Sequence, residues 1–236
     1  YVFYGWWDWR FLSLIFISSA GDFILGKLIY ESNDKSSRKL FLILSLVINL
    51  GLLGFFKYFN FFVDSFASAA SRLGYHPNIT TLQIVLPVGI SFYTFQTLSY
   101  TIDIYRKKTQ PTNDVIAFFA FVSFFPQLVA GPIERASRLL PQFMKKRHFN
   151  NETAKDGLRQ ILWGLIKKVV VADTLAMQVD HIYSHTGYGN LSGIVLAYGA
   201  VLFTFQIYCD FSGYSDIAIG TARLFGFNLM RNFALP

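Results

Sequence analysis

Charged residues are scarce in this sequence of 236 residues, of which only 15% are Asp, Glu, Lys or Arg. A soluble domain usually has about a quarter of charged residues, because its surface faces water. Cysteine is scarcer still, since Cys209 is the only one, and this excludes a disulfide within the chain. The lack of charge argues against a water-soluble globular protein.

Several catalytic and binding motifs are also missing from the sequence. It has no Gly-rich phosphate loop, no Gly-x-Ser-x-Gly elbow and no cysteine pair. None of its four histidines lies inside an apolar run: His76, His148, His181 and His185. His181 and His185 could share a helix face, but a metal ion there would need a further ligand. The sequence therefore predicts neither a metal site nor a bound cofactor.

Apolar residues make up 53% of the chain and are gathered into long runs. Four runs contain at most one charge each: Leu40–Val63, Leu82–Ile102, Val115–Ile133 and Leu191–Cys209. A further apolar segment, Phe11–Tyr30, includes Asp22 and Lys27. Each run is near the roughly 20 residues that a helix needs to cross a bilayer. Because a globular helix needs a polar face, the runs predict an all-α, polytopic membrane helix bundle.

The net charge of +7 does not require a nucleic-acid partner, because Lys and Arg gather in the cytoplasmic loops of membrane proteins, facing anionic lipid. The loops at 31–39 and 106–108 are basic, whereas the loop at 71–81 has Arg72 as its only firm positive charge. This pattern predicts a multi-pass protein in which the first two loops are cytoplasmic and the third is external. The lipid bilayer is its expected partner, and no nucleic acid is expected.

The run at 115–133 conflicts with this orientation, because the most basic stretch of the chain, 134–160, follows it. The conflict disappears if the run enters the membrane and turns back. Three residues that break helices lie where such a turn is expected: Pro126, Gly131 and Pro132. The sequence therefore predicts a re-entrant element here.

Residues 154–172 have an amphipathic helical pattern, with apolar side chains on one side and Arg159, Gln160, Lys167 and Lys168 on the other. This pattern predicts a helix that lies at the cytoplasmic membrane interface. Whether the next stretch, to Tyr183, crosses the membrane is left open. We expect residues 1–236 to form a single membrane domain that is incomplete at both ends.

Two carboxylates, two hydroxyls and a phenol directly follow the last apolar run: Asp210, Ser212, Tyr214, Ser215 and Asp216. A carboxylate at membrane depth is costly unless it is paired or hydrated, so it usually faces a protein interior or a cavity. A helix end in cytoplasmic water, capped by Asp210 or Ser212, explains the pattern equally well. The third apolar segment also contains polar side chains, among them Gln96 and Asp103. Hydrogen bonds between helices are the favoured explanation for these residues.

Six stretches, in order along the chain, resemble the membrane-bound O-acyltransferase (MBOAT) family, and within it the alginate O-acetyltransferase branch. They are Tyr1–Trp7, Phe56–Phe61, Leu86–Gln96, Ser99–Arg106, Phe125–Ile133 and Asp210–Asp216. The resemblance implies a helix bundle around a central funnel, in the bacterial inner membrane. It also implies transfer of an acetyl group from acetyl-CoA or another acyl thioester to an exported polysaccharide such as alginate, together with periplasmic partner proteins.

The resemblance also bears on which residues could be catalytic. The family's catalytic histidine lies beyond the Asn-Phe-x-x-Pro stretch, which Asn232–Pro236 represents here. No histidine of this chain matches it, so we expect this part of the protein to be inactive alone. The candidates for the funnel wall are Gln96, Asp210, Ser212, Tyr214 and Asp216.

Three other functions remain open at this point. One is transfer of D-alanine to teichoic acid by a related branch of the family, and another is a non-catalytic scaffold. The third is a transporter, which would use the same polar residues as a substrate path but would need internal repeats. The triplet Thr-Phe-Gln occurs twice, at 94–96 and 204–206, but chance explains this weak similarity better than an internal repeat does.

Overall fold

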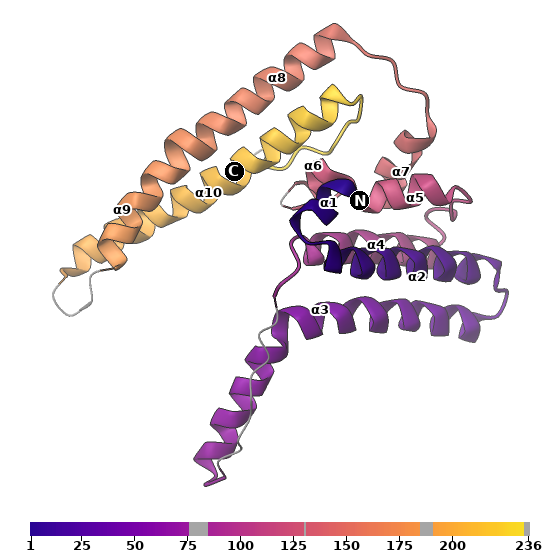
Figure 1. The fold of residues 1–236 in the computed structure, drawn as a ribbon, viewed down its shortest axis with the longest axis horizontal. Coiled ribbons are helices and arrows are strands. Elements are labelled where there is room, and N and C mark those ends of the chain that lie inside the picture. The colour runs from indigo at the N-terminus through magenta and orange to yellow at the C-terminus, as the bar shows by residue number, and fades with distance from the viewer. Residues whose placement is uncertain (76–84, 130, 185–190, 234–236) are drawn as a thin grey trace. The chain divides into compact units, whose positions relative to one another are not determined.

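The computed structural model describes residues 1–75, 85–129, 131–184 and 191–233, and every regular element within those ranges is a helix. This confirms the all-α prediction. Internal contacts divide the chain into two compact units (Figure 1). The first unit consists of Tyr1–Val129 with Arg135–Met144, and the second of Ala130–Glu134 with Lys145–Pro236. The prediction of one membrane domain is not tested by this division.

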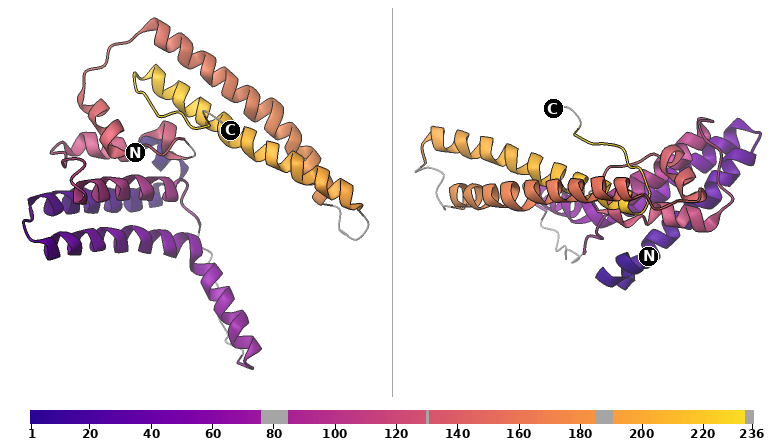
Figure 2. Two further views of the ribbon diagram at one scale, coloured as in Figure 1. Left: turned by 180° about the vertical axis from the view of Figure 1, so that it is seen from behind. Right: turned by 90° about the horizontal axis from the view of Figure 1, so that it is seen from above.

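The first unit is built around three helices that lie side by side, α2, α3 and α4 (Figures 1 and 2). Its elements are α1 (Val2–Trp7), η1 (Trp9–Phe11), α2 (Leu12–Glu31), α3 (Lys35–Arg72), α4 (Ile90–Tyr105), α5 (Val115–Val122), α6 (Phe125–Leu128) and α7 (Ala136–Met144). A tight connection joins α2 to α3, where the Asp34 carboxylate accepts the N–H of Ser37 at 2.8 Å. Asp34 therefore caps α3 at its N-terminus.

Helix α3 is longer than a membrane crossing requires. Its 38 residues extend for about 57 Å at 1.5 Å per residue, against roughly 30 Å for a hydrocarbon core. The buried residues Ser45, Asn49 and Leu53 lie in its first half, which packs on α2 and α4. The second half bends away from these helices and exposes phenylalanines such as Phe61 and Phe66 (Figure 1).

Three helical stretches among the described residues are long and apolar enough to cross a membrane: Trp9–Glu31, Lys35–Arg72 and Gly193–Leu224. These match the first, second and last predicted segments. The third segment was predicted from Leu82, and its residues 82–84 lie outside the described residues. Residues 85–89 are not helical, and α4 begins at Ile90. Gly89 has a left-handed φ of 73°, a conformation that glycine adopts without strain, and Pro87 lacks an N–H.

The apolar run at 115–133 is divided into the short helices α5 and α6. Eight residues of α5 span only about 12 Å, so this helix does not cross a bilayer by itself. Pro126 lies in the first turn of α6, where its missing N–H costs no hydrogen bond. Gly131 and Pro132 are buried in non-helical backbone. The helix break is as predicted, and the re-entry into the membrane stays a prediction.

The second unit consists mainly of two long antiparallel helical rods. One rod comprises α8 (Asn151–Leu165), the π-helix η2 (Ile166–Ala172) and α9 (Asp173–Tyr183), which follow one another without a break. The other is α10 (Gly193–Leu224), which runs beside them in both figures (Figures 1 and 2). The stretch whose membrane crossing the sequence left open is therefore helical.

Glycines bring α8 and α10 into direct backbone contact at two points. A Cβ atom on Gly157 would lie 2.8 Å from the carbonyl oxygen of Gly220, and one on Gly164 would lie 2.5 Å from that of Gly213. Both distances are too short for a real Cβ contact. Small residues at helix contacts allow this close approach in membrane proteins.

The helix predicted over residues 154–172 is present, but its polar side faces differently from our expectation. Gln160, Lys167 and Lys168 make hydrogen bonds and ion pairs with α10 instead of facing water. The exposed side chains of α8 and η2 include Leu158 and Val169. At these positions the rod turns its apolar side outward and its polar side toward a neighbouring helix.

Candidate functional site

Gln96, the one site candidate in the first unit, makes a hydrogen bond between helices. Its buried side-chain amide donates to the carbonyl oxygen of Phe121, at the end of α5, at 2.8 Å. This fixes α4 against α5, as expected for polar residues that hold membrane helices together. Gln96 is absent from the lining of two cavities of the first unit, the one between residues 109–114 and α7 and the one beside α3.

A buried polar cluster joins α2, α3 and α4. Asp22, which is 1% exposed, accepts hydrogen bonds from Ser45 Oγ at 2.6 Å and from Asn49 Nδ2 at 2.7 Å. The Asn49 side-chain oxygen in turn accepts bonds from Ser18 Oγ at 2.8 Å and Thr97 Oγ1 at 3.2 Å. Ser45 and Asn49 are neutral side chains, so these bonds hold three helices together and leave the carboxylate without an ion pair to them.

Only one member of this cluster could be singled out from the sequence. Asp22 stood out in an apolar segment, but its partners did not. Ser45 and Asn49 are four residues apart and therefore lie on one face of α3, amid apolar neighbours. Two polar residues on one face of an apolar helix could have indicated a polar contact with a neighbouring helix.

In the second unit, Asp210 to Asp216 lie in the interior of α10, which begins after its cap Ser192 and ends at Leu224. The alternative in which Asp210 or Ser212 caps a helix end is therefore wrong. The helix continues because Gly213 packs on the backbone of α8 and the carboxylates find partners on the neighbouring rod.

Asp216 is held by two side chains of the opposite rod. Gln160 Nε2 donates to Oδ1 at 3.0 Å, and Lys167 Nζ lies 2.7 Å from Oδ2. The Asp216 side chain is only 14% exposed. Lys167 also lies over the ring of Trp163, 5.7 Å from its centroid. The carboxylate is therefore neutralised and partly shielded from solvent.

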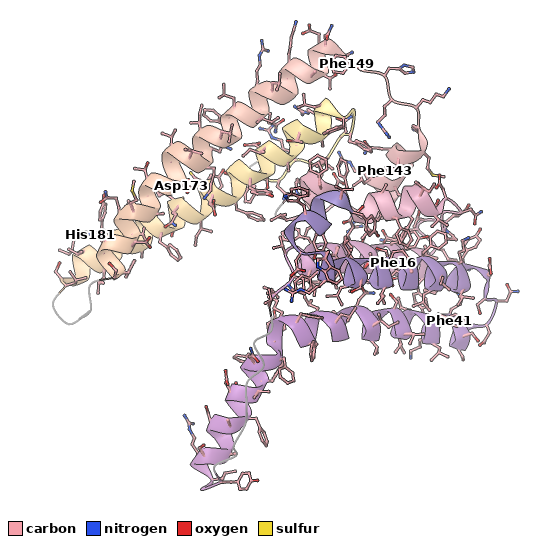
Figure 3. All side chains as sticks on the ribbon, in the orientation of Figure 1. Phe16, Phe41, Phe143, Phe149, Asp173 and His181 are labelled. Carbon is pink, nitrogen blue, oxygen red and sulfur yellow. The ribbon has the colours of Figure 1, made fainter. Side chains whose placement is uncertain are left out.

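Asp210 has a different environment. Its carboxylate lies 2.8 Å from Lys168 Nζ, which also bonds Asp173 at 2.7 Å, and its side chain is 54% exposed. Tyr214 is half-buried. Asp210 and Tyr214 are not among the residues that line the cavity in which Ser212 and Asp216 meet. Figure 3 shows Asp173 on the same rod as His181, which lies toward the far end of α9.

Ser212 and Asp216 come together in a cavity of about 440 Å³, which we call the α8–α10 cavity. Its lining residues come from α8, η2, α10 and the segment after α10: Asp156, Arg159, Gln160, Trp163, Lys167, Ser212, Asp216, Ile219, Arg223, Leu229, Arg231, Asn232 and Phe233. Ser212 is 1% exposed, and its Oγ has no hydrogen-bond partner among the described residues.

The segment after α10 closes one side of the cavity. Gly226, with a φ of 75°, allows the chain to turn back along α10 (Figure 1). The ring of Phe233 then packs on Tyr208 and Phe211 of α10, with centroids 5.7 and 5.3 Å away. The carboxylate of Glu134 accepts a hydrogen bond from the Met230 N–H. These contacts position the neighbouring cavity residues.

The cavity is rich in positive charge. Four basic and two acidic side chains line it, an excess of two positive charges: Arg159, Lys167, Arg223 and Arg231 against Asp156 and Asp216. Arg223 pairs with Asp156, as Lys167 does with Asp216. The sequence did not single out Arg223 or Arg231, because they become neighbours of α8 only through the fold.

The two histidines that the structure describes lie in separate places. His181 lies on α9, and His148 lines a separate cavity with Arg147 and Asn150. His76 and His185 lie outside the described residues. Within the described ranges, no three His, Cys, Asp or Glu side chains gather as metal ligands.

A family model and the similar curated proteins agree on the family of this chain. The family model for membrane-bound O-acyltransferases matches residues 112–236. The chain is 42% identical, over its whole length and 45% of the relative's, to the "Probable alginate O-acetylase AlgI" of Pseudomonas aeruginosa. It is 35% identical to the peptidoglycan O-acetyltransferase of Helicobacter pylori, over 99% of the chain and 48% of that protein.

A more distant relative is the teichoic acid D-alanyltransferase of Streptococcus thermophilus, which is 26% identical over 68% of the chain and 40% of its own length. The chain thus spans about half the length of the curated relatives it matches. The match over more than half of the chain and the motifs in order agree with the helical fold. The chain therefore belongs to the membrane-bound O-acyltransferase family.

Proposed function

We propose that the full-length protein transfers acetyl groups to hydroxyl groups of an exported polysaccharide such as alginate. The observation that carries this proposal is the similarity over the whole chain to proteins named as O-acetylases of alginate and peptidoglycan. Transfer of D-alanine has weaker support, because the relatives named for it are 25–26% identical over part of the chain.

The α8–α10 cavity supports an active-site role for this part of the protein. Acyl transfer to a hydroxyl needs a general base and donors that stabilise the oxyanion. In this proposal the general base is the family's catalytic histidine, which is not one of the four histidines of this chain. Asp216 and its partners Gln160 and Lys167 form a preorganised polar wall near which the acyl group is positioned.

The proposal includes the donor, the partners and the location. The donor is acetyl-CoA or another acyl thioester, and periplasmic proteins complete the modification of the polysaccharide. The protein is a multi-pass protein of the bacterial inner membrane, which is supported by three helices of spanning length and by the exposed apolar surface of α10.

The test compares bacterial cells with and without the complete gene. Cells are fed labelled acetate, and the exported polysaccharide is isolated and treated with mild alkali to release ester-bound groups. We expect labelled acetate only from cells that carry the gene. Release of D-alanine from a cell-wall polymer instead, or no gene-dependent ester at all, contradicts the proposal.

A further inference from the structure

We propose that Glu134 is a positioning residue for the α8–α10 cavity, a role that rests on the proposed function. Its carboxylate fixes the course of residues 229–233, which we call the returning segment. Glu134 and the returning segment belong to the same compact unit. Glu134 is not among the residues that line the cavity, so it acts on the reaction through the residues that it holds.

The returning segment supplies the part of the cavity wall that does not come from the two rods. Four of its five residues line the cavity: Leu229, Arg231, Asn232 and Phe233. The fifth, Met230, is the residue whose backbone N–H donates to the Glu134 carboxylate. This bond therefore holds the centre of the wall from outside the cavity.

Backbone hydrogen bonds do not set the course of the returning segment. The last such bond after α10 runs from the N–H of Phe227 to the carbonyl oxygen of Ala222. Within the described ranges, residues 229–233 make no backbone-to-backbone hydrogen bond. A segment without such bonds can follow several paths, so contacts with side chains must select one of them.

Burial makes the Glu134 carboxylate an effective anchor. Glu134 is 1% exposed, so water cannot readily take the place of the Met230 N–H. A hydrogen bond to a carboxylate is roughly twice as strong as one between neutral groups. The stretch that presents Glu134 is constrained as well, because Gly131 and Pro132 are buried and proline has a fixed φ.

Ring contacts hold both ends of the stretch after α10 independently of Glu134. Arg147 lies over the ring of Phe227, 4.2 Å from its centroid, and Phe233 packs on α10. Loss of the Glu134 bond should therefore shift Arg231 and its neighbours without detaching the segment. A misplacement of about 1 Å in an active site can lower a rate about 10²-fold.

Substitutions separate the length of the Glu134 side chain from its charge. Glu134→Gln keeps the length and an acceptor oxygen but removes the charge, whereas Glu134→Asp keeps the charge and is one methylene shorter. If the anchor depends on reach, Gln should preserve it and Asp should lose it. Glu134→Ala removes both properties. Glu152→Ala is the control, because the Glu152 side chain is 81% exposed and lies in the same unit.

Hydrogen–deuterium exchange measures the anchor directly, in protein produced from its complete gene and held in phospholipid nanodiscs. The peptide that covers 229–233 should exchange about tenfold faster in Glu134→Ala and Glu134→Asp, since each loses a charge-assisted bond. Glu134→Gln should exchange at most about threefold faster, because a neutral bond remains. Glu152→Ala should match the unchanged protein.

The rate of acetate transfer measures the consequence for the reaction. In the assay of ester-bound acetate, Glu134→Ala and Glu134→Asp should lower the rate by about tenfold or more, and Glu134→Gln should restore it to within about threefold. The melting temperatures should stay close to that of the unchanged protein, because the ring contacts at both ends remain. A purely structural role would lower the rate and the melting temperature together.

The outcomes separate the anchor from the proposed function. Unchanged exchange in Glu134→Asp, or faster exchange with full acetylation, would overturn the proposal. So would an active Asp variant beside an inactive Gln variant, since charge and not reach would then matter. If Glu134→Ala does not fold, the Gln and Asp variants alone decide. If the unchanged protein forms no gene-dependent acetate ester, the proposed function fails, and the exchange data still test the anchor.

Discussion

The two units each place an aspartate in the middle of an apolar helix, but they surround it differently. Asp22 in the first unit is fully buried and bonded by neutral side chains of α3. Asp216 in the second unit is paired with a lysine, is partly exposed and borders a cavity. A carboxylate within an apolar segment therefore does not by itself indicate a site.

What separates the two cases is the space and the charge next to the carboxylate. The buried side chains around Asp22 bond one another across α2, α3 and α4, so their hydrogen bonds contribute to helix packing. The α8–α10 cavity has room for a ligand and an excess of positive charge. The first arrangement stabilises the fold, and the second can act on a molecule that enters it.

The largest effect is expected where the backbones of the second unit touch. Gly164→Ala would place a Cβ atom 2.5 Å from the Gly213 carbonyl oxygen, and this clash can be relieved only by separating the helices. We expect a loss of about 3 kcal/mol in the free energy of unfolding, measured by denaturation in detergent. Gly54→Ala is the matched control, since nothing lies within 4 Å of its new Cβ. Equal stability of the two variants would contradict this contact.

The next effect is expected in the first unit's buried cluster. Asn49→Ala removes a donor to Asp22 and the acceptor for Ser18 and Thr97. Leaving these buried groups unpaired should cost about 2 kcal/mol of stability. Gln160→Ala in the second unit should cost less than about 1 kcal/mol, because Asp216 keeps Lys167. The reverse order in denaturation experiments would contradict the contrast between the units.

The substitution Asp216→Asn tests, by the rate of acetate transfer, whether Asp216 differs from Asp22 in having a role beyond helix packing. The change removes a charge beside the cavity but preserves the size of the side chain. We expect acetate transfer by the full-length protein to fall on the order of tenfold, or ~1.4 kcal/mol, because Lys167 loses its ion-pair partner and its fixed position. The protein's melting temperature should change little. Loss of folding with no specific loss of activity would place Asp216 in the same structural class as Asp22.

The smallest effect is expected at the cap of α3. Hydrogen bonds from Ser37, first of all from its N–H, hold the pKa of Asp34 below its ordinary value. The ionised cap therefore stabilises the helix above the ordinary Asp pKa of about 3.9, and this contribution is lost as the pH falls below that value. The melting temperature of Asp34→Ala should lie slightly below that of the unchanged protein at pH ~7. The difference should shrink as the pH falls below ~3.9 and through the lowered pKa of Asp34; a constant difference would exclude the cap as its cause.

Hydropathy was sufficient to predict the long helices, because α2, α3 and α10 contain apolar runs of membrane-spanning length. Local chemistry was sufficient to predict a break near Pro126. The start of α4 was misplaced because the Pro87 and Gly89 positions were treated as an interruption within a helix. The structure shows that the helix begins after them.

The site was less predictable, for a physical reason. An amphipathic pattern shows that the two sides of a helix differ, but it does not show which side faces a neighbouring helix. The polar side of α8 therefore looked like a water-facing surface until α10 was beside it. Arg159 is far in sequence from Arg223 and Arg231, and only the turn at Gly226 brings Arg231 back to the cavity that Arg159 lines.

The spacing of the paired glycines has a consequence for changes of chain length. Gly157 and Gly164 are seven residues apart, as are Gly213 and Gly220, so an antiparallel match of both pairs fixes one alignment of the two rods. A single residue inserted between either pair would rotate the following part of its helix by about 100° and replace a glycine contact with a side chain. Insertions before Asn151 or after Leu224 leave both matches intact. Length variation is therefore expected in these flanking stretches and not between the glycines.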